Sequence, residues 1–251
     1  MAILKSGNPA LNDKTFAAGY ALSDAEVMTE RGTLNKFFIL CVLVIASASC
    51  TWSAFNDGKD ITSWIWIGAL GGLGVAIVTV FKPVWSPFLA PLYALLEGLF
   101  IGGISVTYNH IFDKFAPGIV MQAVALTFGT VIAMFLLYRS GIIKATEKFK
   151  SVVMIATGGI AVFYLISIGL RYFNVNIGFL HEGSLLGIGF SLVVVSIAAL
   201  NLILDFDMIE TGVSIGAPKY MEWYGAFGLI VTIVWLYLEI LRLLSKINSR
   251  R

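Results

Sequence analysis

Seven long apolar runs are the feature that most constrains the fold of this chain. A helix that crosses the hydrocarbon core of a bilayer needs about 20 mainly apolar residues, and the sequence has seven such runs separated by short polar turns. They lie at roughly 36–55, 62–81, 86–108, 117–138, 151–172, 184–208 and 223–243. Because no connection between them is long enough for a second domain, we expect one all-α bundle of seven transmembrane helices.

The composition agrees with an integral membrane protein. The 251 residues are 58% hydrophobic and 13% charged, whereas soluble domains are about 25% charged. The formal net charge is only +2, and no tract of like charges indicates a nucleic acid partner. The bilayer itself is therefore the first expected partner.

The distribution of Lys and Arg predicts the orientation. With a cytoplasmic N-terminus, most basic loop residues lie inside and only Lys59, Lys114 and Arg171 lie outside, as the positive-inside rule requires. We therefore divide the chain into a polar cytoplasmic segment 1–35, a transmembrane domain 36–243 and a short basic tail 244–251. Seven crossings would place this tail outside, so either one apolar run is re-entrant or the tail departs from the rule.

Four acidic residues lie within or at the end of the apolar spans, namely Glu97, Asp205, Asp207 and Glu239. An ionised side chain at the bilayer centre costs about 2.5–3.5 kcal/mol on insertion scales, so each of them is a candidate for function. For Glu97, in the middle of the third span, the alternatives are a site on an ion pathway and a protonated or hydrogen-bonded structural glutamate.

The stretch NLILDFDMIETG, residues 201–212, ends the sixth span with three carboxylates. Asn201 and Asp205 share one helix face, whereas Asp205 and Asp207 differ by about 200°. We therefore expect Asp205 to face inward with Asn201 and Asp207 to face away. Asp207 and Glu210 share the other face near the interface with water, where a solvated helix end is the alternative to a functional site.

The seventh span carries a stripe that includes Thr232, Glu239 and Arg242. One interpretation is an intrahelical pair of Glu239 and Arg242, with Arg242 reaching toward the interface. In the other, Glu239 faces Asp205 across the bundle within hydrogen-bonding reach. Two such carboxylates would share one proton and form a proton-responsive latch, and once deprotonated they would attract a hard cation such as calcium.

Enzyme chemistry finds no support in the sequence. The string GVSIG, 212–216, matches a nucleophile elbow, but no strand precedes it. The string HEGSL begins like a zinc motif, but Leu185 stands where the second histidine would be. We therefore predict a protein that is not an enzyme, with no catalytic residues and no cofactor.

Several of these stretches resemble a known family. YALLEGLFIGGIS in the third span, LILDFDMIE at the end of the sixth and WLYLEILRLL in the seventh are similar to the Bax-inhibitor superfamily, the transmembrane BAX-inhibitor-motif proteins. MTERGTLNKF and MEWYGAFGLIVTIVWLYLEILRLL are closest to its bacterial branch. The resemblance implies a seven-helix bundle with the last helix in the centre, and a place in the bacterial inner membrane.

The resemblance also implies a function and a set of site residues. Members are described as pH-sensitive calcium leak pathways controlled by a pair of aspartates, and others as modulators of cell death or of a membrane protease. The first acid of the pair falls on Asp205, its partner on Glu239 and the glutamate of the third helix on Glu97. The second acid is Glu here, and the segment between the two acids is longer than expected. Straight helices would separate their depths by about 12 Å.

From these observations we expect a pH-sensitive leak channel or transporter for calcium or another cation. Asp205 and Glu239 would form the gate and the candidate calcium site, Glu97 and Asn201 would lie on the pathway, and Asp207, Glu210 and Arg242 are secondary candidates. The alternative is a non-conducting regulatory protein that binds a membrane protease or stress-response complex through its polar N-terminal segment.

Overall fold

The computed structural model describes residues 27–173 and 184–250, and within them all seven predicted spans are helices long and apolar enough to cross a membrane. The helices are α2 (Glu30–Asn56), α3 (Thr62–Phe81), α4 (Ser86–Phe112), α5 (Ile119–Arg139), α6 (Glu147–Tyr172), α7 (Leu185–Ser214) and α8 (Met221–Asn248). A 3-10 turn, η2 (Pro83–Trp85), leads into α4. Residues 1–26 of the expected N-terminal segment and the loop with His181 lie outside the described residues.

The helix ends follow local sequence chemistry. The side chains of Thr29 and Ser184 cap α2 and α7 by accepting hydrogen bonds from Gly32 and Gly187. α2 begins at Glu30, inside the segment 1–35 that was expected to be a polar cytoplasmic segment. α7 continues to Ser214, so the acidic stretch that was expected at the end of the sixth span lies within the helix.

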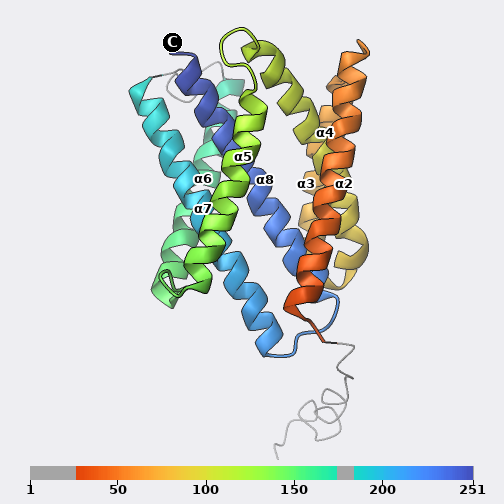
Figure 1. Cartoon of the computed structure of the whole chain (residues 1–251), viewed down its shortest axis with the longest axis vertical. Helices are drawn as coiled ribbons and strands as arrows, with labels where there is room; N and C mark the ends of the chain where they lie inside the picture. The colour runs from red at the N-terminus through yellow and green to blue at the C-terminus, as the bar shows by residue number, and fades with distance from the viewer. Residues whose placement is uncertain (1–26, 174–183, 251) are drawn as a thin grey trace, which may run out of the picture.

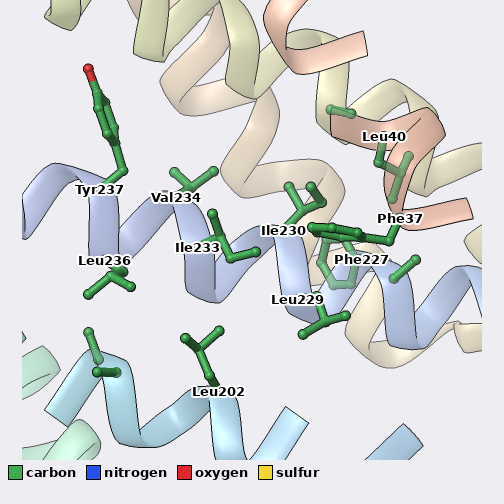
Figure 2. Packing of buried hydrophobic residues seen from close by; sticks show 14 of the residues in the cluster. Phe37, Leu40, Leu202, Phe227, Leu229, Ile230, Ile233, Val234, Leu236 and Tyr237 are labelled. Atoms are coloured by element: carbon green, nitrogen blue, oxygen red, sulfur yellow. The ribbon is translucent and has the colours of Figure 1, made fainter. Parts of the chain in front are cut away.

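The last helix is the centre of the bundle, as the resemblance implied. α8 packs against α2, α4, α5 and α7, and Figure 1 shows it running obliquely between them. Phe37 and Leu40 of α2 approach one side of α8, while Leu202 of α7 approaches another (Figure 2). The long apolar side chains on the outside of the bundle, such as Phe88 at 82% exposure, form a surface suited to lipid.

Small residues bring α2, α3 and α4 close together, which the Gly68/Gly72 pair of α3 and the Gly98/Gly102 pair of α4 allow. A Cβ at Gly102 would lie 2.6 Å from the carbonyl oxygen of Ala48 in α2, and one at Gly68 would lie 2.6 Å from that of Leu96 in α4. Both contacts involve backbone atoms, so a methyl group at either position would force the helices apart.

One end of the bundle is important for the site. α2 begins there, and the α3–α4, α5–α6 and α7–α8 connections lie at the same end (Figure 1). We call it the N-terminal face. Its structured elements include the connection from Ile215 to Tyr220, which joins α7 to the first turn of α8.

Candidate functional site

Asp205 lies on the face of α7 that packs against α8. Its Oδ1 atom is 3.9 Å from the position that a Cβ of Gly228 would take, and the Thr232 hydroxyl is the side-chain donor beside the carboxylate. The Oδ2 atom is buried and has no hydrogen-bond partner within the described part of the chain. A buried oxygen without a partner is rare in folded proteins, and it marks Asp205 as exceptional.

Glu239 has a different and fully paired environment. Its side chain is 2% exposed, and Oε1 accepts hydrogen bonds from Arg242 at 2.9 Å and from Tyr164 of α6 at 3.0 Å. Arg242 also donates to the Tyr164 hydroxyl at 2.6 Å and lies over its ring. The three residues form a clamp between α6 and α8, and the intrahelical pair that the sequence offered as an alternative is present.

The predicted pairing of Asp205 with Glu239 is therefore wrong. α8 is one uninterrupted helix, and Thr232, the neighbour of Asp205, precedes Glu239 by seven residues. At 1.5 Å per residue this is about 10 Å along the helix axis. The two acids occupy different depths, as the straight-helix estimate indicated, because neither helix breaks to bring them together.

The same separation removes the shared calcium site expected at these two carboxylates. Among the described residues no group of three or more His, Cys, Asp or Glu side chains is arranged to hold a metal ion. Any cation that meets Asp205 in this conformation would find one carboxylate and the Thr232 hydroxyl, rather than a cage of carboxylates.

The neighbouring polar residues of α7 divide between two helices. Asn201 donates to the Thr157 hydroxyl of α6 at 2.8 Å, so it faces α6 and does not join Asp205 at α8. Asp207 points away from α8, as helix phase predicted, and pairs with Lys150 of α6 at 2.8 Å.

Glu210 lies near the N-terminal face and accepts a hydrogen bond from Tyr138 of α5 at 2.5 Å. With Asp207 and Lys144 it lines a pocket of about 320 Å³. Glu210 is exposed and the Asp207 side chain is 24% exposed, so both acids have the partly solvated setting that was the alternative to a functional site.

Glu97 is buried between α3 and α4. It lies beside the Tyr93 hydroxyl one turn earlier in α4, and its Oε2 atom is 3.0 Å from the position of a Cβ at Gly72 in α3. Tyr93 in turn packs edge-on against Phe227 of α8. Glu97 therefore faces α3, whereas Asp205 faces α8 from α7.

A further acidic site at the N-terminal face was missed by the sequence analysis. Glu222, in the first turn of α8, is completely buried. Its Oε1 atom accepts from the backbone N–H and the hydroxyl of Thr29 at 2.9 and 2.8 Å. Lys219 lies 2.9 Å from the same oxygen, and Lys36 pairs with Oε2. Its only sequence signal is that MTERGTLNKF and MEWYG both carry the family resemblance.

A comparison with family models agrees with the geometry. A model described as "Bax inhibitor 1 like" matches residues 8–249, almost the whole chain. Searches of curated proteins and of solved structures found no match. The family match covers every helix described above, including both Asp205 and Glu222.

Proposed function

The chain belongs to the Bax inhibitor 1 like family, and on that premise we propose that it is a pH-sensitive leak pathway for calcium or a similar cation, gated by the protonation of Asp205. The Lys and Arg distribution supports a cytoplasmic N-terminal face, and the bacterial resemblance supports an inner-membrane location. The proposal keeps the expected function and replaces the expected carboxylate pair by a single acid.

The unpartnered Oδ2 atom of Asp205 is the observation that carries the proposal. A buried ionised carboxylate is costly unless it is paired and hydrogen-bonded, and protonation removes that cost. Glu239 and Glu222 have basic partners that balance an ionised carboxylate, whereas Asp205 has only the neutral Thr232 hydroxyl beside it. Glu97 likewise has only a neutral hydroxyl beside it, that of Tyr93, but within the described part of the chain Asp205 is the acid that has a buried oxygen without a hydrogen-bond partner.

The contact between α7 and α8 gives this proton a mechanical consequence. With the proton bound, the neutral carboxyl packs against Gly228 and α7 stays close to α8. Without it, the charge favours water or a cation, and both need space between the helices. Since loss of the proton favours the separated arrangement, flux should rise with pH.

The remaining acids have supporting parts in this proposal. Glu239 stabilises the junction of α6 and α8 and is not part of the gate. Glu97 of α4, which faces α3, and Asn201 of α7, which faces α6, stay proposed residues of the pathway. Asp207 and Glu210 stay secondary candidates: they line the pocket at the N-terminal face together with Lys144, and Lys150 pairs with Asp207, so two lysines balance the two acids there.

Calcium flux into liposomes containing the purified protein, measured from about pH 5 to pH 8, tests the proposal. We expect flux that increases with pH. A protein that is folded but passes no calcium or monovalent cation at any pH would refute the leak pathway. It would favour a regulator of a membrane protease or stress-response complex, because the segment that precedes α2 is anchored to α8 through Thr29 and Glu222.

A further inference from the structure

A three-residue segment ahead of α2 crosses the N-terminal face and attaches to the α7–α8 connection. Val27 and Pro218 form an isolated antiparallel bridge, and the backbone N–H of Met28 donates to the carbonyl of Ala217 at 2.7 Å. We call residues 27–29 the strap. Its backbone is thereby fixed across the junction of α7 and α8.

Glu222 fastens the other end of the strap. The backbone N–H and hydroxyl of Thr29 both donate to its Oε1 atom. Close packing holds the carboxylate in place, because a Cβ at Gly32 would overlap it. Hydrogen bonds to a charged group are stronger than those between neutral groups, so one buried carboxylate provides a large part of the attachment.

The side chain of Met28 points into the bundle and fills a gap that two glycines leave. It is 3% exposed. Its Sδ atom lies 3.0 Å from the position of a Cβ at Gly212 in α7, and its methyl carbon lies 3.5 Å from that at Gly225 in α8. An unbranched, flexible thioether is suited to filling such an irregular space.

This gap lies directly above Asp205 on the seam between α7 and α8. Along α8, Gly225 contacts Met28, and Gly228, three residues deeper, faces Asp205. Along α7, Ile209 lies between Gly212 and Asp205 and packs against Gly225. Three residues of helix span about 4.5 Å, so Met28 lies about one turn nearer the N-terminal face than Asp205, at a level where Thr33 and Ile209 also contact the Gly225 position.

We infer that the strap is a stopper, in which Glu222 holds Met28 over the α7–α8 seam and controls access from the N-terminal face to Asp205. Release of the strap uncovers the seam, and Ile209, which packs against Gly225, is then the next side chain that water or a cation must pass to reach this carboxylate. The inference rests on the proposed function for its effect on flux, whereas its effect on access can be measured without any flux.

The strap is placed so that it can be released. The side chains of Lys36 and Lys219 are 17% and 46% exposed, although the carboxylate they pair with is fully buried. Water therefore reaches one side of the fastening. Among the described residues only 27–29 must move for Met28 to leave, and none of the helices described above has to unfold.

Cysteine accessibility at position 205 tests this inference in the full-length protein. Cys41→Ala and Cys50→Ala remove the native thiols, and Asp205→Cys places a thiol at the end of the proposed route. The protein in nanodiscs is treated with a charged, water-soluble methanethiosulfonate, and the labelling rate is measured by mass spectrometry. Met28→Ala and Glu222→Gln are added separately, and Tyr138→Phe serves as a control that removes a hydrogen bond to Glu210 at the same face.

We expect labelling about tenfold faster or more with either strap variant and an unchanged rate with Tyr138→Phe. Glu222→Gln weakens the charge-assisted hydrogen bonds that hold Thr29, and Met28→Ala removes the side chain that fills the gap. Equal rates in the parent and both strap variants would overturn the inference, as would an equal increase in the control. If Glu222→Gln fails to fold, judged by gel filtration, Met28→Ala decides the result alone.

Flux then separates the strap from the proposed gate. Val27→Cys with Pro218→Cys, in the background without Cys41 and Cys50, joins the two bridge partners by a disulfide when oxidised. We expect oxidation to lower the flux several-fold and reduction to restore it. If the parent protein shows no flux, the proposed function is refuted, and the labelling result still tests the inference about the strap. If flux is present but does not change on oxidation, the inference about the strap alone is refuted.

Discussion

Replacing Arg242 by Gln should destabilise the protein strongly, because it leaves Glu239 buried with an uncompensated charge. The Glu239 side chain is 2% exposed and accepts from Arg242 at 2.9 Å and from Tyr164 at 3.0 Å. After Arg242→Gln the only original donor left is the neutral Tyr164 hydroxyl. Glu239→Gln is milder, since its amide oxygen still accepts from Tyr164 and Arg242 stays 37% exposed.

The two substitutions should cost different amounts of folding free energy, because Arg242→Gln leaves a buried charge without its partner and Glu239→Gln does not. Breaking a buried ion pair from one side costs about 3–5 kcal/mol. Because Arg242 is partly exposed, we expect the lower end, about 3 kcal/mol, for Arg242→Gln. Glu239→Gln loses mainly one charge-assisted hydrogen bond and should cost about 1–2 kcal/mol. The double variant should be more stable than Arg242→Gln alone, since it contains no unpaired charge.

Reversible unfolding by sodium dodecyl sulfate in lipid–detergent micelles, followed by circular dichroism, measures these free energies. The double-mutant cycle isolates the coupling between Glu239 and Arg242. Two results would refute the clamp. One is an Arg242→Gln variant whose free energy of unfolding lies within about 0.5 kcal/mol of the parent's, well below the expected cost. The other is a double variant no more stable than Arg242→Gln.

Two further predictions concern packing and a polar contact within the bundle. Gly102→Ala should cost about 1–3 kcal/mol by the same unfolding assay, because its methyl group would press on the Ala48 backbone of α2. The control Gly129→Ala, at a helical position with nothing within 4 Å, should be neutral or slightly stabilising. Equal costs for the two variants would contradict the close approach of α2 and α4. Asn201→Leu should cost about 0.6–1.7 kcal/mol through the lost hydrogen bond to Thr157, and a Thr157→Val variant that remains sensitive to Asn201→Leu by the same amount would show that the two are not coupled.

The sequence was sufficient for the helices and their neighbours but not for the pairing of acids. Run length and the polar turns between the runs gave all seven spans. Helix phase also gave the opposite directions of Asp205 and Asp207. Phase, however, describes only rotation about a helix axis. Depth follows from chain length only if both helices stay straight, and the straight-helix estimate did separate Asp205 from Glu239. The sequence does not show whether a helix breaks to bring the two acids together.

Glu222 was missed for a related reason. An acid in the first turn of a helix is an ordinary feature, since it complements the helix dipole in contact with water. Its burial arises from Thr29 and Lys36, almost 200 residues earlier in the chain, and no local pattern reports such a contact. The strap was hidden in the same way, because its bridge joins Val27 to Pro218.

We propose that Asp205 alone carries the pH dependence of cation flux. The pH profile of calcium flux in liposomes should be compared for the parent, Asp205→Asn and Glu239→Gln, with protein amounts matched by folded fraction. We predict that Asp205→Asn loses most of its pH dependence, whatever its absolute flux, while Glu239→Gln keeps the parent profile. A parent-like profile in Asp205→Asn, or a profile flattened equally by Glu239→Gln, would contradict the claim.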